Sequence, residues 1–314
     1  MLLLSQGINS YFQMITDEIH AFSGDILKFA GDALFAEWKI NDSDGAEDSN
    51  KSVESCVLSA ARCGSDIVSK WSNFPIYDSI SGNENEEPIS TLNVHCGIGV
   101  GKIIGVHIGD HTSNREFIIL GDPIDQVAKA EGLAALGELV ASPEVLNILS
   151  KSHDLSKEID EMHEGYKVIA TSTATYFACK LEYESNQIRF QLSESQSTQH
   201  LHELCKDFDT KGLKELRKLI SLYVHPVVID DDEEEINSPT ARKVEERIKA
   251  QAELRPIYVM FISPLIEAKL TGDSDHDNKI IDQLNDIFLV TIRELDRFNG
   301  HLRQFIVDDK GRIA

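Results

Sequence analysis

Long hydrophobic runs are absent from this sequence of 314 residues. No stretch approaches the roughly 18 to 20 consecutive apolar residues that a membrane span requires. The first residues, "MLLLSQGINSYFQ", lack the basic region and the small-residue cleavage site of a signal peptide. We therefore expect a soluble, cytoplasmic protein with no membrane span.

Positive charge and cysteine are also scarce. Acidic residues outnumber basic ones by 53 to 30, which gives a formal net charge of -23. Such a chain repels the phosphates of DNA and RNA, so we expect no nucleic-acid partner. The five cysteines form no Cys-x-x-Cys pair and no Cys/His cluster at zinc-ligand spacing, which favours reduced thiols.

Helical and strand-like segments alternate through the first part of the chain. Apolar residues at helical spacing predict amphipathic helices over 1–22 and 53–71, and Asp122 followed by Pro123 has the pattern of a helix start. Strands are expected on both sides of the "AGD" turn, over 92–100 with a continuation after a glycine bend, and at "FIIL", "ELVAS" and "GYKVIATSTATYFACKLE". The alternation predicts an α/β or α+β domain that closes near residue 182.

Composition changes after that point. Residues 183–253 are polar and acidic with one helical segment, which is typical of a solvated linker. Strand-like apolar sequence resumes at "LRPIYVMFISPLIE". We expect three parts: a first domain over 1–182, a linker over 183–253, and the start of a second domain over 254–314.

An internal repeat supports this division. "FSGDILKF" (22–29) matches "FNGHLRQF" (298–305), and each follows an amphipathic helix and precedes a turn signal. In the second copy, the strand "IYVMFISP" comes before the helix, whereas the first helix begins almost at Met1. The chain is therefore expected to be a fragment that lacks the first strand of copy one and most of copy two.

Three motifs carry a family resemblance. "GDILKFAGDALFAEW", "VHCGIGVGKIIGVHIGD" and "FIILGDPIDQVAKAEGLA" resemble the first catalytic domain of the class III nucleotide cyclases, and within them the bicarbonate-responsive soluble adenylyl cyclases. The resemblance implies two ferredoxin-like α+β cyclase domains that pair within one chain. It also implies conversion of ATP to cyclic AMP and pyrophosphate, with GTP as the other candidate substrate.

Asp32 is the residue to which the resemblance gives a metal. The family holds two Mg²⁺ ions with two aspartates, one of them in this hairpin turn, and hard oxygen ligands suit that ion. The second aspartate would precede Met1, and the family's asparagine and arginine would follow Ala314. Catalytic residues are therefore unassigned, and we expect the chain alone to be inactive or nearly so. Without the motif, Asp32 would be interpreted as an ordinary turn residue.

Lys28 is a single cation between apolar neighbours. As an isolated feature it resembles an edge-strand lysine with a solvated ammonium group. The family resemblance makes it an anion contact in the bicarbonate pocket. The family's second cation, an arginine, falls on Ala128 here, which argues against a bicarbonate response and leaves the adjacent Lys129 as the remaining candidate.

Gln304 is the counterpart of Lys28 in the second copy. The family has a lysine there that recognises adenine, so Gln304 is the candidate nucleotide-binding residue. A glutamine side chain donates and accepts hydrogen bonds and suits either purine. The alternative to an enzyme is a non-catalytic cyclase-homology module that binds nucleotide or a regulatory partner.

Several other residues receive structural interpretations. Asp25 is expected to shape the strand entry, and Trp38 to close the hairpin. The glycines of "GIGVG" fail the Walker pattern, so they are expected to allow strand bending and close approach of backbone near the nucleotide. "DSDHDN" (273–278) lacks the glycine and the terminal glutamate of an EF-hand and is expected to be a solvated loop.

Overall fold

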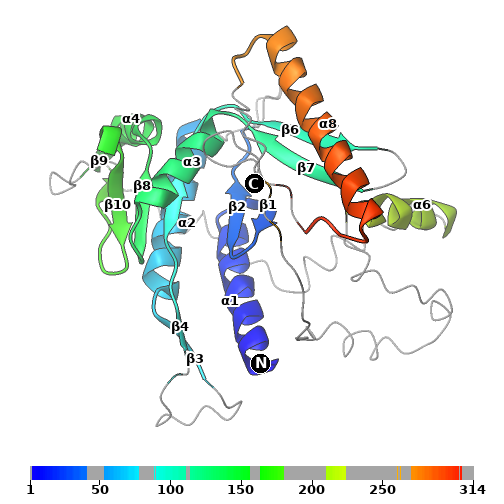
Figure 1. Ribbon diagram of the computed structural model, residues 1–314. Coiled ribbons are helices and arrows are strands. Elements are labelled where there is room, and N and C mark those ends of the chain that lie inside the picture. The colour runs from blue at the N-terminus through cyan, green and yellow to red at the C-terminus, as the bar shows by residue number, and fades with distance from the viewer. Residues whose placement is uncertain are drawn as a thin grey trace. The chain divides into compact units, whose positions relative to one another are not determined.

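The computed structural model of this chain is a mixed α+β structure (Figure 1). It describes residues 2–40, 53–77, 90–110, 114–155, 163–179, 210–223 and 270–303, together with residues 88, 260, 262 and 305. Helices accompany small sheets in which most strand pairs are antiparallel, and this confirms the predicted α+β class. None of the described helices is both long and apolar enough to cross a membrane.

The chain forms two compact units. Unit 1 comprises Met1–Lys102 and Asp122–Leu192, and unit 2 comprises Ile103–Gly121 and Ser193–Ala314. The segment Ile103–Gly121 thus groups with the C-terminal part of the chain, although it lies within the first predicted domain. The sequence boundaries at 182 and 254 stay a prediction.

In unit 1, two helices pack with a β-hairpin. The helices are α1 (Leu2–Ala21) and α2 (Val53–Trp71), and the hairpin strands are β1 (Asp25–Ala30) and β2 (Ala33–Glu37). All four elements were predicted. Their apolar side chains form one core cluster, whose members include Tyr11, Ile15, Ile19, Phe22, Cys63 and Ile67, with Ile26, Leu34, Ala36 and Trp38 of the hairpin packed against it. Burial of these side chains supplies the main stabilisation of the arrangement.

A three-stranded sheet forms the other half of unit 1. Its order is β10 (Lys167–Thr171), β8 (Glu138–Ala141) and β5 (Cys96–Ile98), where β8 is antiparallel to β10 and parallel to β5. Helices α2 and α4 (Pro143–Ser152) share a buried core with this sheet. Helix α3 (Asp122–Leu133) begins at the predicted Asp122 and contacts β5.

The apolar run 92–109 was only partly predicted. It forms three separate strands, β4 (Ser90–Leu92), β5 and β6 (Ile104–Gly109), so the prediction of one strand over 92–100 was wrong. Two further strands had no clear signal in the sequence. They are β3 (Phe74–Ile76), which pairs with β4, and β9 (His153–Leu155), which pairs with the expected β11 (Phe177–Cys179).

Unit 2 combines a hairpin and a long helix from distant parts of the sequence. Strands β6 and β7 (Arg115–Leu120) pair antiparallel, and Figure 1 shows α8 (Ser274–Arg297), in orange to red, lying across them. Their apolar faces form one cluster together with Phe305, and its other members are Ile108, Ile118, Leu120, Ile280, Leu284, Phe288 and Ile292. This shared core explains why the segment Ile103–Gly121 groups with the C-terminal part of the chain.

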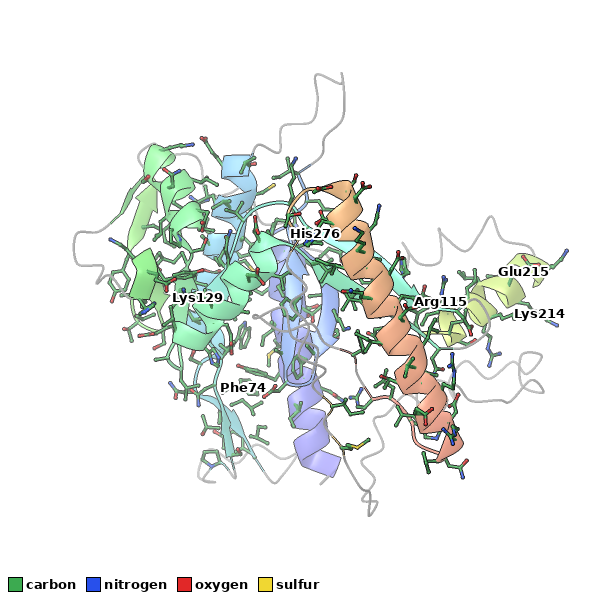
Figure 2. All side chains as sticks on the ribbon, turned by 45° about the horizontal axis from the view of Figure 1, so that its top comes forward. Phe74, Arg115, Lys129, Lys214, Glu215 and His276 are labelled. Atoms are coloured by element: carbon green, nitrogen blue, oxygen red, sulfur yellow. The ribbon has the colours of Figure 1, made fainter. Side chains whose placement is uncertain are left out.

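The predicted helical segment of the linker is α6 (Thr210–Ser221). The residues after it are tied to the β6–β7 hairpin. The backbone N–H of Arg115 donates to the carbonyl of Leu222 at 2.8 Å, and the hydroxyl of Tyr223 lies 3.0 Å from Nδ1 of His107. Figure 2 shows Arg115 close to α6.

The expected loop "DSDHDN" is instead the start of α8. The side chain of Asp273 accepts the N–H of Asp275 at 3.0 Å and caps the helix. Asp277 is buried and accepts the N–H groups of Thr271 at 2.8 Å and Gly272 at 3.1 Å. The prediction of a solvated loop was wrong because these carboxylates satisfy backbone donors at a helix terminus.

The internal repeat has a structural counterpart at two helix ends. Beyond α1, Ser23 has a positive φ of 60°, and Gly24 N–H donates to the carbonyl of Ile19 at 2.9 Å. Beyond α8, Asn299 has a φ of 53°, and Gly300 N–H donates to the carbonyl of Leu295 at 2.8 Å. Equivalent positions of the two copies therefore end their helices with the same left-handed motif.

Several predicted features lie outside the described residues. They include the loops at 42–52 and 81–87, the acidic sequence 224–253, and most of the apolar run 254–267. Within that run, the described residues Met260 and Ile262 are exposed. The structure assigns no strand to residues 301–303.

Candidate active site

The β1–β2 hairpin holds the residue to which the sequence assigned the metal. Ala30 pairs with Ala33, which leaves Gly31 and Asp32 as the two turn residues, and Gly31 has a φ of 65°. A glycine accommodates this left-handed conformation without strain. The carboxylate-bearing residue Asp32 is exposed at the tip of the hairpin.

Lys28 lies in the middle of β1 opposite Phe35. The register shifts between Ile26 and Lys28, so Leu27 is an extra residue in a β-bulge. A bulge changes which face of the strand the following side chains occupy. Lys28 is half-buried, and β1 belongs to a two-stranded sheet, so both the edge-strand interpretation and the anion-contact interpretation remain compatible with its position.

The structural interpretations of Asp25 and Trp38 agree with the contacts. The Asp25 carboxylate accepts the N–H of Ile26 at 2.8 Å, at the entry of the strand. The indole N–H of Trp38 donates to the carbonyl of Phe22 at 2.9 Å. Gly24 leaves room for the ring, because a Cβ atom at this position would lie 2.7 Å from it. Trp38 therefore closes the base of the hairpin against the end of α1.

Lys129 lies on α3 (Figure 2), and its ammonium group contacts a carboxylate and an aromatic ring. Its ammonium group forms an ion pair with Glu164, which belongs to a 3₁₀ turn (His163–Gly165), and it lies 5.4 Å from the centroid of the Tyr166 ring. The hydrogen bond from Lys129 lowers the pKa of Glu164. The ammonium group of Lys129 is therefore already paired with a carboxylate.

The glycine-rich segment that contains Gly97 and Gly99 lies close to the backbone of helix α3. A Cβ atom at Gly97 would lie 2.6 Å from the carbonyl oxygen of Val127, and one at Gly99 would lie 2.7 Å from that of Pro123. Both contacts are with the backbone of α3. The close backbone approach at these glycines is to α3, and the expected approach near the nucleotide stays a prediction.

Gln126 fixes the bend that follows these glycines. Its side-chain oxygen accepts the N–H of Val100 at 2.9 Å, and its amide nitrogen donates to the carbonyl of Val100 at 3.1 Å. The buried hydroxyl of Ser142 donates to the same side-chain oxygen at 2.9 Å. Sequence reasoning missed this clamp, since an isolated glutamine on a helix carries no distinguishing pattern.

Burial makes two thiols of unit 1, those of Cys63 and Cys96, poor nucleophiles. Cys56, Cys63 and Cys96 are free cysteines. Burial raises the pKa of the Cys63 thiol well above its usual range, and burial likewise raises the pKa of Cys96 to about 12. At neutral pH both stay protonated, and thiols are far weaker metal ligands and nucleophiles than thiolates.

The side chain of Asp32 has the chemistry of a metal ligand. An exposed carboxylate is a hard oxygen donor and fits a divalent cation such as Mg²⁺. No group of three or more His, Cys, Asp or Glu side chains with the geometry of a metal centre occurs within the part of the chain that the structure describes. Gln304 lies outside the described residues, whereas its neighbour Phe305 is buried.

Comparison with known proteins finds sequence relatives that are named adenylate cyclase type 10. The chain is 28% identical over 149 residues to adenylate cyclase type 10 of Oryctolagus cuniculus, and that match covers 48% of this chain and 8% of the relative. With adenylate cyclase type 10 of Homo sapiens it is 22% identical over 309 residues, 98% of this chain and 17% of the relative. The chain is homologous to adenylate cyclase type 10.

The homology has a limited extent. This chain spans less than a fifth of the length of the adenylate cyclase type 10 proteins that it matches. No family model matches it. Among solved structures, the catalytic core of a rhodopsin-guanylyl cyclase in complex with ATPalphaS aligns with a TM-score of 0.36 at 15% identity, over 54% of this chain and 83% of that one. The adenylyl cyclase CyaB from P. aeruginosa aligns with a TM-score of 0.34 at 15% identity, over 54% and 83%.

Proposed function

We propose that this chain contributes to a cytoplasmic nucleotide cyclase that converts ATP to cyclic AMP and pyrophosphate. The observation that carries the proposal is the homology to adenylate cyclase type 10 along nearly the whole chain. The exposed Asp32 at the turn of a well-formed hairpin supports it, because this is the position at which the family resemblance expects a metal ligand. GTP is the alternative substrate.

In the proposed reaction, the 3'-hydroxyl oxygen of ribose attacks the α-phosphorus of the same nucleotide. A bond forms between this oxygen and phosphorus, the bond to the bridging oxygen breaks, pyrophosphate leaves, and the hydroxyl proton passes to a base or to water. Asp32 would bind Mg²⁺, which supplies positive charge for the triphosphate and lowers the pKa of the hydroxyl when bound. Its role is to hold and orient the charged reactant.

Three further residues complete the proposal. Lys28 is the proposed anion contact, supported by its half-buried place beside the bulge of β1. Lys129 is a weaker candidate for the second cation, because an anion would compete with Glu164. Gln304 is the proposed contact to the purine. Pairing of two cyclase domains within a longer chain is part of the same proposal.

The test is magnesium-dependent formation of cyclic nucleotide by the full-length gene product, with ATP and with GTP. We expect cyclic AMP formation by the wild type and a loss of at least about 100-fold in Asp32→Ala, the scale typical of removing a group that stabilises charge in the transition state. Asp25→Ala is the matched control from the same hairpin, and its activity should stay within a few fold of wild type.

Two results would contradict the proposal. One is nucleotide binding without any turnover in the full-length protein, which would favour the non-catalytic module. The other is turnover that Asp32→Ala does not reduce. Calorimetric binding of Mg²⁺ and ATP separates these cases, since binding is measured whether or not chemistry follows.

A further inference from the structure

Helix α6 (Thr210–Ser221) has the opposite charge balance to the chain as a whole. Acidic residues outnumber basic ones by 53 to 30 in the whole sequence, whereas α6 carries four basic side chains and one acidic one. The basic residues of the helix are Lys211, Lys214, Arg217 and Lys218, and the acidic one is Glu215. The proposed reaction gives no role to this local excess of positive charge.

The apolar side chains of α6 lie on one face of the helix. Consecutive residues of an α-helix are rotated by about 100°, so Leu213, Leu216 and Ile220 line the same side. By the same rotation, Lys214 and Lys218 lie on the opposite side. The helix is therefore amphipathic, with basic side chains opposite its apolar face.

Much of this apolar face is exposed. Leu213 is 42% exposed, Leu219 is 54% exposed and Ile220 is 53% exposed, whereas Leu216 is half-buried. A single exposed leucine needs no explanation. Three large apolar side chains exposed together on one short helix are instead typical of a surface that a partner covers.

The residues after α6 hold its C-terminal end on the β6–β7 hairpin. The N–H of Arg115 donates to the carbonyl of Leu222 at 2.8 Å, and Nη1 of Arg115 donates to the hydroxyl of Tyr223 at 3.3 Å. Figure 2 shows the side chains of Lys214 and Glu215 pointing away from Arg115. The helix thus presents its exposed side chains while its end stays attached.

The distribution of charge distinguishes between two kinds of partner. A flat anionic membrane would bury the apolar face and leave the cations of the opposite face pointing toward water. A protein groove that encloses the helix contacts both faces, with an apolar floor for the leucines and an acidic rim for the lysines. The spacing of Leu213, Leu216 and Ile220 is the i, i+3, i+7 pattern of helices that bind in such grooves.

We infer that α6 is a docking helix for an acidic protein whose apolar groove encloses one helix, the chemistry of a Ca²⁺-loaded EF-hand sensor. Leu213 and Ile220 enter the groove, and Lys214 and Lys218 pair with carboxylates at its rim. In such sensors Ca²⁺ binding exposes the groove, so the association depends on Ca²⁺. The inference rests on the charge, periodicity and exposure of α6, and it does not depend on the proposed reaction.

The probe is fluorescently labelled calmodulin, a sensor of this class. Its binding to the full chain is measured by fluorescence anisotropy, once with Ca²⁺ and once with a chelator. We expect saturable binding of one calmodulin per chain with Ca²⁺ and none with the chelator. Vesicles of phosphatidylserine and phosphatidylcholine form a second arm, and we expect the chain not to sediment with them.

A double variant tests the apolar contact. Leu213→Gln combined with Ile220→Gln should weaken calmodulin binding at least about tenfold, since docking removes both side chains from water. Glutamine is a good helix former, so α6 should persist, and circular dichroism checks this. Val290→Gln is the matched control at a 52% exposed position of α8, and it should bind like the wild type.

A charge reversal tests the acidic rim. Lys214→Glu should weaken binding about fivefold at low salt and by much less at about 1 M salt, where the Debye length is only about 3 Å. Lys279→Glu reverses an exposed lysine of α8 and should leave binding unchanged at both salt concentrations.

Amide hydrogen exchange locates the contact. Slower exchange over Thr210–Ser221 in the complex supports the inference, and unchanged exchange there overturns it. It is also overturned by absence of saturable binding, by equal binding with the chelator, by binding that the double variant leaves unchanged, or by binding to the vesicles in place of calmodulin. None of these readouts uses cyclase activity, so they stand apart from the test of the proposed function.

Discussion

The contact between β5 and α3 predicts a large effect of adding one methyl group. In Gly97→Ala the new Cβ atom would lie 2.6 Å from the carbonyl oxygen of Val127 and 2.7 Å from the amide nitrogen of Glu131. Both are backbone atoms, so no side-chain rotation relieves the overlap. Either α3 or β5 has to shift, and both belong to the packed interior of unit 1.

The magnitude follows from the cost of overpacking. Extra methylene or methyl groups in a well-packed interior cost about 1–3 kcal/mol. We expect the upper end of this range, since two backbone contacts and a third contact with the Cβ of Ala130 are all under 3.0 Å. With a urea m-value of about 3 kcal/mol/M, the unfolding midpoint should fall by about 1 M.

The assay is equilibrium urea unfolding followed by circular dichroism and tryptophan fluorescence. Gly132→Ala is the matched control on α3, where an added Cβ would meet nothing within 4 Å. Alanine is favoured over glycine in a helix by about 1 kcal/mol, so this change should raise the midpoint. An unchanged midpoint in Gly97→Ala, or a shift of the same sign in both variants, would refute the packing argument.

Two further predictions concern unit 1. Burial raises the pKa of Tyr11 to about 12, so the unfolded chain releases this proton before the folded one, and the free energy of unfolding should decline as pH rises above 10. Tyr11→Phe should show a smaller decline between pH 10 and 12, and equal slopes would contradict the assignment. Ser142→Ala removes a buried hydroxyl that bonds Gln126 and caps α4 at Val145, so it should cost about 1–3 kcal/mol in thermal or urea unfolding. The exposed Ser150→Ala should change stability by less than about 0.5 kcal/mol, and a similar loss in both variants would count against the buried network.

Elements with a strong local pattern could be predicted from the sequence. The helices at Leu2–Ala21 and Val53–Trp71 show clear helical periodicity, and the hairpin turn is marked by Gly31-Asp32. Asp122 and Pro123 identified the start of α3 by capping chemistry. These signals are local, because each depends on a few residues that are close in sequence.

The features that the sequence did not reveal depend on tertiary contacts. Three-residue strands such as β3 are too short to show a period, and they exist because a partner strand lies beside them. From the sequence, Asp277 was interpreted as a solvated charge, because the backbone N–H groups that its carboxylate accepts are brought to it only by the fold. For the same reason the ion pair of Lys129 with Glu164 and the clamp of Gln126 on Val100 could not be foreseen.

In the candidate site too, some features could be predicted from neighbouring residues in the sequence and others could not. The position of Asp32 in a tight turn followed from its own neighbours, and the structure agrees. The bulge beside Lys28 could not be predicted in this way, since a register shift is a property of two paired strands rather than of one. Roles for Lys28, Lys129 and Gln304 therefore stay predictions that need ligand-binding measurements.

Phe29 and Phe305 are equivalent positions of the internal repeat, but a damaging substitution would have different effects at them in a cell. Loss of Phe305 removes a side chain from a closed core, so the expected phenotype is reduced abundance through proteolysis of unfolded chains. Loss of the half-exposed Phe29 leaves the buried core of unit 1 intact, so the amount of protein should stay close to normal. The burial of a repeated residue, and not its identity, therefore decides how strongly a sequence variant lowers the amount of protein.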